Sequence, residues 1–534
     1  MVVASCTALS RLSGVLRVLL VGAVLGPTHL GDAYQVTNTL PNLVWYGFLA
    51  GSLVPALLVP VLVREIQRRA DHRVDEVSRG FLGVAALAAL VIAPLAVLGL
   101  PLLMQLATLG IPTQLSEQQV HLARLLVLLT APQTFLYALI GTAGAVMYAH
   151  RRFALPSVGP ALENIGVITV LLAVAAGFGS TGHARTAPVG ELVLLGAGST
   201  AAVALNAALQ WVGARRCGVR LFPTWGWRDE TVRLILHRTQ HSVVAAALLA
   251  AQTLLILLLA SRVTGGAVAL QVALNFYVLP VALIATPIGL ALLPELSALA
   301  HAGRRRQFDE MLARGLASVV FLAAPAAVGY VLMAAPVARV VAAGRMGTAT
   351  GHLMIAGSLA ALAVGLVGQS LCFVATQGSY SRGNTRTPLG CMAVQALLCL
   401  LLCGGAVVIW DGPPLVTAVA AAYGVATLAG GLLLVVLMSR SNGSDLLARL
   451  LVSGLRVGVG IAAMAVPVRL LALLLTNALP GRVGDALALT VGSVVGLVVY
   501  VAVERLLRSP ELAWWVSGLR RRRTPEPEAE ELAA

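Results

Sequence analysis

The sequence predicts an all-α, polytopic membrane protein with about 14 transmembrane helices. Of the 534 residues, 58% are hydrophobic and only 11% are charged, whereas a soluble globular domain has about 45–50% apolar and about 25% charged residues. The apolar residues also form successive runs of about 20 or more, the length that a helix needs to cross a bilayer. Only short segments remain between these runs, so we expect no separate soluble domain.

Apolar runs separated by polar turns place the fourteen predicted spans in order along the chain. They lie near residues 3–26, 38–63, 81–109, 119–147, 157–179, 189–214, 234–261, 267–297, 312–335, 350–379, 388–410, 415–438, 450–476 and 483–506. Loops after even-numbered spans carry most of the Arg residues, whereas loops after odd-numbered spans carry few. Since Arg-rich loops stay in the cytoplasm, both termini are predicted to be cytoplasmic.

The first span contains two basic residues, Arg11 and Arg17. An Arg near the bilayer centre costs about 2.5–3.5 kcal/mol, so we expect this pair to meet water, a counter-ion or an anionic ligand. For Arg11 the alternative is a surface anchor that reaches the cytoplasmic headgroups. The acids Glu163 and Glu191 lie toward predicted span ends, which leaves no interior carboxylate for a cationic substrate. The predicted substrate is therefore anionic, and phosphate suits Arg.

The second and eighth spans are the richest in Pro and Gly. Pro removes a backbone hydrogen bond from a helix, and such breaks are tolerated in membranes where other groups compensate. Because the two spans occupy equivalent places in a predicted repeat, we expect them to act as hinges.

Two pairs of matching segments predict that repeat. The second span has Pro60-Val-Leu near its end and the eighth has Pro294-Glu-Leu, 234 residues later, and both prolines precede a basic loop. The loops Tyr148–Pro156 and Tyr380–Pro388 match at an offset of 232 residues. Chance is the alternative, because Pro after a basic turn is common in membrane loops. A parallel repeat of six helices is typical of transporters in which two lobes rock around a substrate site.

The repeat divides the chain into four predicted parts. An N-terminal lobe (1–232, helices 1 to 6) and a C-terminal lobe (233–448, helices 7 to 12) surround a central cavity. Two extra helices follow at 449–508. A cytoplasmic tail at 509–534 is predicted to be largely disordered, because it is rich in Pro and Glu from Thr524 onward.

The formal net charge is +15, and all 37 basic residues are Arg. Nucleic-acid binding needs basic residues on one solvated face, but here they are scattered over short loops, so no nucleic-acid partner is expected. The six Cys lie in apolar spans or beside basic loops and are predicted to be reduced thiols. Cys399 and Cys403 are one helical turn apart but have no nearby His or acidic ligands. We therefore expect neither a metal nor a cofactor.

Five motifs, in order, resemble one known family. They are Ser10-Arg-Leu-Ser-Gly-Val-Leu-Arg17, Gly31-Asp-Ala-Tyr-Gln-Val36, Leu40-Pro-Asn-Leu43, Leu292-Leu-Pro-Glu-Leu-Ser297 and Tyr380-Ser-Arg-Gly-Asn-Thr-Arg-Thr-Pro388. They resemble the MurJ (MviN) lipid II flippases of the multidrug/oligosaccharidyl-lipid/polysaccharide exporter superfamily. The resemblance implies a bacterial inner-membrane transporter, not an enzyme. It would move lipid II, the polyprenyl-pyrophosphate-linked peptidoglycan precursor, to the outer leaflet by alternating access, in cell wall biogenesis and control of cell shape.

The resemblance also implies a substrate site. Arg11 and Arg17 would line a cationic cavity and meet the pyrophosphate, and Asp32 matches an Asp of the family. We add Asn42 from the Leu-Pro-Asn motif and, as groups that would stack on or hydrogen-bond to sugar, Trp45 and Asn275; ordinary packing is the alternative for the last two.

The chain departs from the family pattern in the cavity charges. Trp45, Tyr46 and Ala50 stand where the family has an Arg pair and an acid. In the eighth span, Asn275 and Val278 stand where it has an Arg and an acid. About half of the expected cavity charge is therefore missing.

These departures keep two alternatives open. The first is a non-transporting homologue that serves as a scaffold in envelope assembly, and the second is a flippase for another polyprenyl-linked oligosaccharide. A polytopic glycosyltransferase or a cation-coupled drug exporter would need carboxylates that the sequence does not offer. The expected partners are lipid II, the lipid bilayer and proteins of cell-wall synthesis, and the expected state is a monomer.

Overall fold

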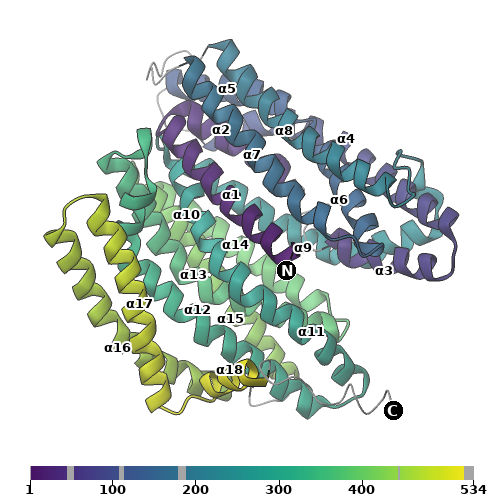
Figure 1. The fold of residues 1–534 in the computed structure, drawn as a ribbon. Helices are drawn as coiled ribbons and strands as arrows, with labels where there is room; N and C mark the ends of the chain where they lie inside the picture. The colour runs from purple at the N-terminus through teal and green to yellow at the C-terminus, as the bar shows by residue number, and fades with distance from the viewer. Residues whose placement is uncertain (1, 45–52, 108–112, 179–187, 443–445, 522–534) are drawn as a thin grey trace. The chain divides into compact units, whose positions relative to one another are not determined.

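The computed structural model describes residues 2–44, 53–107, 113–178, 188–442 and 446–521, and these ranges are helical apart from short turns (Figure 1). Twelve helical segments in them are long and apolar enough to cross a membrane. They coincide with predicted spans three to fourteen, so the all-α, polytopic prediction is confirmed. The first predicted span coincides with a helix at Val2–Val24, which is not among these twelve. The second predicted span extends into residues 45–52, which are not described, so the total of fourteen spans stays a prediction.

The chain forms two compact units, which we describe separately. Unit 1 comprises Met1–Asn275, Val341–Ser358 and Met392–Tyr423, and unit 2 comprises Phe276–Val340, Leu359–Cys391 and Gly424–Ala534. The six-helix lobes expected from the sequence repeat stay a prediction.

Unit 1 holds the helices of the first half of the chain. They are α1 (Val2–Val24), α2 (His29–Val44), α3 (Leu53–Gln67), α4 (Asp71–Ala107), α5 (Thr113–Thr130), α6 (Gln133–Ala149), α7 (Ala154–Phe178), α8 (Val189–Arg215), η2 (Gly226–Arg228), α9 (Glu230–Ala260) and the start of α10 (Gly266–Pro280). The helix α7 packs on α1 and α8 (Figure 1). Residues 140–147 of α6 are all buried, because their mainly small side chains let neighbouring helices approach closely.

The fourth predicted span, 119–147, is broken in the structure. The helix α5 ends at Thr130, and α6 begins at Gln133 after Pro132. Pro132 has no N–H to donate to the preceding turn, so a continuous helix would lose a backbone hydrogen bond here. The two helices together still form one segment long enough to span a membrane, Val120–Ala149.

Unit 2 is built from the helices of the second half. Those that lie wholly or partly in it are α10, η3 (Val281–Ala285), α11 (Thr286–His301), α12 (Arg305–Val341), α13 (Ala349–Ser381), α14 (Arg386–Ile409), α15 (Pro413–Asn442), α16 (Leu446–Ala478), α17 (Arg482–Leu506) and α18 (Pro510–Arg521). The short turn η4 (Gly344–Met346) belongs to unit 1.

Two helices of unit 2 approach each other closely at glycines. A Cβ placed on Gly365 of α13 would lie 2.8 Å from the Cα of Gly424 on α15. These glycines therefore allow close helix packing.

The eighth predicted span contains a π-helical turn, η3, between α10 and α11. Pro280 ends α10, and Pro287 follows at the start of α11. Each proline lacks the N–H of a regular helix, and π-turns inside helices often accompany functional sites. The irregularity lies in the span that was expected to bend, and its action as a hinge stays a prediction.

The last helices attach to α12 through polar and apolar contacts. Arg339 of α12 forms an ion pair of 2.7 Å with the buried Asp485 of α17. Tyr500 of α17 donates a 2.8 Å hydrogen bond to the Phe321 carbonyl of α12. These residues join the predicted extra helices to the rest of unit 2.

The predicted tail differs from the expectation of disorder at its start. Residues 510–521 form α18, and residues 522–534 lie outside the described residues. A proline opens this helix, and Glu511 lies in its first turn, both of which favour a helix N-terminus. Ser453 of α16 also donates a 2.7 Å hydrogen bond to Glu511, which holds α18 on unit 2.

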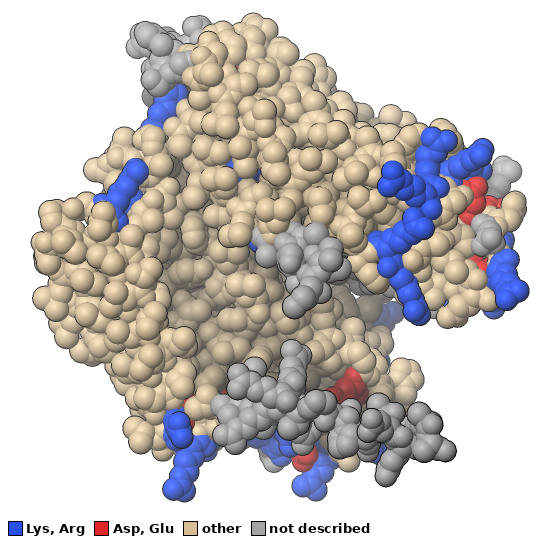
Figure 2. Space-filling model, in the orientation of Figure 1, with Lys and Arg blue, Asp and Glu red and all other residues tan. Residues whose placement is uncertain are grey.

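Charged side chains are sparse on the visible surface (Figure 2). On this face of unit 1, the Arg side chains gather around the ends of α3, α4 and α6 (Figure 2). A surface that is mostly uncharged between basic ends is what a membrane-spanning bundle requires.

Candidate functional site

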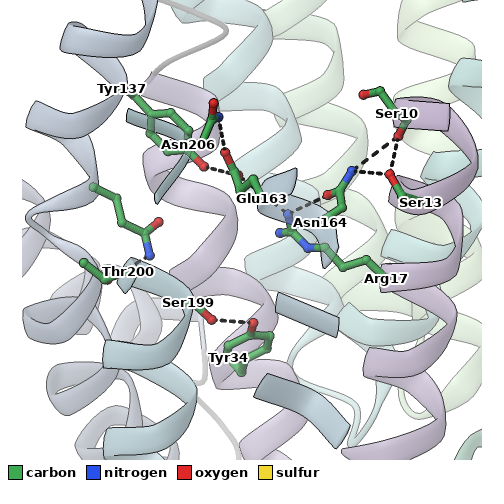
Figure 3. A network of polar contacts seen from close by, with 11 residues as sticks. Ser10, Ser13, Arg17, Tyr34, Tyr137, Glu163, Asn164, Ser199, Thr200 and Asn206 are labelled. Carbon is green, nitrogen blue, oxygen red and sulfur yellow. Dashed lines mark hydrogen bonds and ion pairs between the residues drawn. The ribbon is translucent and has the colours of Figure 1, made fainter. Parts of the chain in front are cut away.

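Arg17 lies on α1 and turns toward α7 (Figure 3). Its side chain is only 16% exposed. The Nη1 atom donates a 3.3 Å hydrogen bond to Oδ1 of Asn164 and lies 3.9 Å from Oε1 of Glu163. The guanidinium therefore meets an amide and a carboxylate of a neighbouring helix.

Glu163 is held by more than this cation. Tyr137 of α6 donates a 2.8 Å hydrogen bond to its Oε1 atom, and Asn206 of α8 donates a 3.0 Å hydrogen bond to its Oε2 atom (Figure 3). Gln210, one turn further along α8, donates to Oδ1 of Asn206 at 3.3 Å. Three helices thus fix the carboxylate of α7.

Glu163, expected toward the end of a span, lies well inside a helix. The helix α7 begins at Ala154, so Glu163 is its tenth residue, and it is only 7% exposed. The interior of the bundle therefore does contain a carboxylate, although it is paired with a cation. An acid followed by an amide, Glu163-Asn164, inside an otherwise apolar run was the signal that could have revealed it.

Asn164 connects the arginine to the start of α1. Its Nδ2 atom donates to Oγ of Ser13 at 3.2 Å and to the carbonyl of Ser10 at 3.3 Å. A Cβ on Gly14 would stand 3.4 Å from the same nitrogen, so this stretch of α1 lies directly against the amide. Asn164 thus aligns α1 with α7 and positions the Arg17 side chain.

The guanidinium keeps donors in reserve. Only Nη1 of Arg17 has a polar partner within the described part of the chain. The Nε and Nη2 atoms lie on one edge of the planar group and form the fork that binds carboxylate or phosphate through two hydrogen bonds. Arg17 can therefore accept an anionic ligand without releasing Asn164.

Unit 1 contains two further polar pairs, of which Tyr34 and Ser199 are drawn in the same view as Arg17 (Figure 3). The hydroxyls of Tyr34 on α2 and Ser199 on α8 are 2.9 Å apart. The Nε2 atom of Gln133 donates to Oγ1 of Thr200 at 3.0 Å, while its buried Oε1 atom has no partner among the described residues. The interior of unit 1 is therefore polar over several helices.

Arg11, the other predicted cation of α1, is placed differently. Its side chain is exposed, and no hydrogen bond or ion pair joins it to another described residue. Asn42 lies in α2 but its side chain is not described, and Trp45, Tyr46 and Ala50 lie outside the described residues. The contacts predicted for these residues stay predictions.

Asp32 acts on the start of another helix. The carboxylate is fully buried, and it accepts hydrogen bonds from the backbone N–H groups of Gly265 at 2.7 Å, Ala267 at 3.0 Å and Val268 at 3.4 Å. These groups belong to the turn before α10 and its first residues, where N–H groups lack helical partners. The geometry makes Asp32 a helix cap, and its predicted contact with substrate remains untested.

Among the described residues, Asn275 has no hydrogen bond to Arg17 or to its partners Glu163 and Asn164. Its Nδ2 atom donates to the Gln271 carbonyl one turn earlier at 2.8 Å. The buried Oε1 atom of Gln271 is without a partner in the described ranges. Val278, the other departure from the family pattern in this span, is 45% exposed. No group of three or more metal-ligating side chains occurs in the described part of the chain.

Comparison with known proteins supplies the family. The family model of the lipid II flippase MurJ matches residues 21–499. A probable lipid II flippase MurJ from Rhizobium tropici is 24% identical over 398 residues, which cover 74% of this chain and 73% of that protein. The lipid II flippase MurJ of Burkholderia cenocepacia is 25% identical over 398 residues, covering 72% and 73%.

Solved structures agree on the fold. A lipid II flippase MurJ in an inward closed conformation matches with a TM-score of 0.70 at 18% identity, over 95% of this chain and 99% of that one. An inward-facing multidrug resistance MATE family transporter of the MOP superfamily matches with a TM-score of 0.63 at 13% identity, over 83% and 98%. The family model covers most of the sequence, and the resemblance inferred from its motifs is confirmed: the chain belongs to the lipid II flippase MurJ family.

Proposed function

We propose that this protein is a lipid II flippase of the bacterial cytoplasmic membrane, which carries the polyprenyl-pyrophosphate-linked peptidoglycan precursor from the inner to the outer leaflet by alternating access. Family membership and the likeness to transporter folds support this function. The observation in this chain that carries it is Arg17, a guanidinium inside an apolar helix with one edge unengaged. The movement changes no covalent bond, so the protein is a transporter and not an enzyme.

Arg17 is the proposed anchor for the pyrophosphate. A phosphate group would receive two hydrogen bonds from Nε and Nη2, while Asn164 keeps Nη1 and the direction of the side chain. The anion would also offset the cost of a cation in the membrane, which is about 2.5–3.5 kcal/mol on insertion scales. A phosphate beside Arg17 therefore favours both substrate binding and the position of the guanidinium in the membrane.

The other predicted site residues take secondary places in this proposal. Arg11 is a second, more exposed cation on α1. Asn42, Trp45 and Asn275 are proposed contacts for the sugars of the headgroup. Asp32 supports the site indirectly, because its carboxylate caps the start of α10.

We also propose how the protein is set in the membrane. Arg-rich loops put both termini in the cytoplasm, and an inside-negative potential favours outward movement of an anion by about 2.3 kcal/mol per charge per 100 mV. The protein would act as a monomer, and proteins of cell-wall synthesis are its candidate partners.

The test is rescue of bacteria that have been depleted of their own lipid II flippase. We expect the unmutated chain to restore growth and cell shape, and Arg17→Ala to lose rescue at equal membrane abundance. The matched control is Arg469→Ala, which removes an exposed Arg from the apolar helix α16 of unit 2. This control is expected to keep rescue.

Failure of the unmutated chain to rescue, at normal abundance in the membrane, would contradict the proposal. It would favour the scaffold homologue, or a flippase for another polyprenyl-linked oligosaccharide. Vesicles that contain the purified protein then separate the two alternatives, because only a flippase moves a labelled polyprenyl-pyrophosphate glycan between leaflets.

A further inference from the structure

The charge of Arg17 is already matched inside the protein. Glu163 lies 3.9 Å from its Nη1 atom, and the side chains of this pair are only 16% and 9% exposed. We propose that Glu163 is a resident counter-ion that competes with the substrate phosphate for Arg17, and thereby sets how tightly the substrate binds and how readily it leaves. The inference rests on the proposed function, because it assumes that Arg17 meets the pyrophosphate.

The contact between Arg17 and Glu163 is weaker than the hydrogen bonds that hold Glu163 in place. Charge-assisted hydrogen bonds from nitrogen to carboxylate oxygen are usually about 2.7–2.9 Å long, so 3.9 Å leaves Coulomb attraction without a hydrogen bond. Glu163 itself is held by hydrogen bonds of 2.8 Å from Tyr137 and 3.0 Å from Asn206. Arg17 can therefore shift toward a ligand without breaking a hydrogen bond to Glu163, while the carboxylate stays in place.

The arrangement lets the empty and the occupied site both stay stable. In the empty site, Glu163 compensates a cation that would otherwise be costly in the membrane. In the occupied site, phosphate and carboxylate share one guanidinium, and their mutual repulsion limits the affinity. A transported ligand must bind well enough to enter and weakly enough to leave, and a fixed carboxylate beside the cation meets both needs.

The test is substrate binding by the full chain in lipid nanodiscs, with fluorescent lipid II as the probe. We expect Glu163→Gln, which keeps the shape of the side chain, to bind the probe at least about tenfold tighter than the unmutated chain. Dissociation should slow in proportion, and the flipping rate in vesicles should fall as release becomes limiting. In an Arg17→Ala background, Glu163→Gln should no longer change the affinity, because the two residues act through one guanidinium.

Tyr137→Phe provides a variant with the opposite sign. Without the tyrosine hydroxyl, Oε1 of Glu163 can turn to accept a hydrogen bond from Arg17, so competition increases and the probe should bind several-fold more weakly. A carboxylate with only a structural role would weaken binding in both variants. Glu504→Gln is the matched control, because it neutralises a fully buried acid of α17 in unit 2 and should leave affinity unchanged.

The outcomes separate the two proposals. If the unmutated chain binds and flips lipid II but Glu163→Gln binds it equally or more weakly, the counter-ion role is overturned and the flippase function stands. If the unmutated chain does not bind lipid II at all, the proposed function is overturned, and the inference falls with it. If Glu163→Gln does not fold, the sign of the Tyr137→Phe effect decides, since tighter or unchanged binding would overturn the competition.

Discussion

Arg17 is stabilised in an apolar helix by neighbours on α6, α7 and α8 rather than by solvent. Asn164 accepts its hydrogen bond, and Glu163 offers the opposite charge. Tyr137 and Asn206 in turn satisfy the carboxylate. Removal of any member leaves a buried polar group without its partner, which costs more than the net strength of the bond itself.

Arg17→Ala should therefore lower the stability of the protein in addition to removing its transport activity. Loss of the cation leaves Glu163 buried and uncompensated, so we expect the free energy of unfolding to fall by about 1–3 kcal/mol. The double variant Arg17→Ala, Glu163→Gln should recover most of this loss, because no buried charge remains. Thermal unfolding of the detergent-purified variants, arranged as a double-mutant cycle, measures the coupling. Additive effects of the two substitutions would contradict the pairing.

Asp32 leads to a second prediction at this scale. Asp32→Ala removes the acceptor of three backbone N–H groups at the start of α10, and loss of a helix cap costs about 0.5–2 kcal/mol. Asp32→Asn keeps one acceptor oxygen and should lose less. The measurement is the unfolding midpoint of both variants. An Asn variant that is less stable than the Ala variant would show that the carboxylate does not act as a cap.

At the residue scale, the sequence predicted the cation and missed its partners. An Arg in an apolar run is conspicuous, because placing a charged side chain in the membrane costs free energy. Arg17 could therefore be identified from the sequence. Glu163 escaped because its distance from the end of α7 was misjudged. Asp32 was assigned to the substrate site because it matches an Asp of the family, and a sequence does not show that the N–H groups of residues 265–268 lie against it.

At the element scale, the positions of the helices could be predicted well and their irregularities less well. Twelve predicted spans reappear because their apolar length is a sufficient signal. The break at Pro132 was missed, since a single proline either kinks a helix or ends it, depending on what compensates the lost hydrogen bond. The helix α18 was missed because the Pro- and Glu-rich composition from Thr524 onward was applied to the whole tail at 509–534.

The ion pair between α12 and α17 gives a prediction for elements. Arg339→Ala leaves Asp485, which is 4% exposed, without its cation, whereas Asp485→Asn leaves Arg339 with a side chain that is 39% exposed. We expect the first variant to lose more stability, by about 1–3 kcal/mol, because the stranded arginine can reach solvent and the stranded carboxylate cannot. Chemical unfolding in detergent compares the two. Equal losses would mean that burial does not decide the cost.

At the scale of the whole molecule, the distribution of arginines predicts the orientation. The turn at Gly383 follows the tenth predicted span and the turn at Gly412 the eleventh. Arg382 and Arg386 flank the first turn and Asp411 the second, so the first should face the cytoplasm and the second the outside.

Reporter fusions test this orientation. Alkaline phosphatase, which is active only outside the cytoplasm, should be inactive when fused after residue 383 and active when fused after residue 412. Green fluorescent protein fused at the same two sites should give the reverse pattern. Activity of the phosphatase at residue 383 would contradict cytoplasmic termini and the even number of spans.

The family could be predicted from short motifs because they recur in one order along the chain. The sizes of the compact units could not, since a sequence offset of 232–234 residues reports ancestry rather than contacts.

The cap at Asp32 has a consequence for biosynthesis. The carboxylate leaves the ribosome long before residues 265–268, which follow it by more than 230 positions. At the usual 5–20 residues per second, the nascent α2 waits roughly 10–50 s for its hydrogen-bond donors. Asp32 lies between the first two predicted spans, where water can hydrogen-bond to the carboxylate during that time. The carboxylate therefore exchanges water for these N–H groups only after the start of α10 has been synthesised.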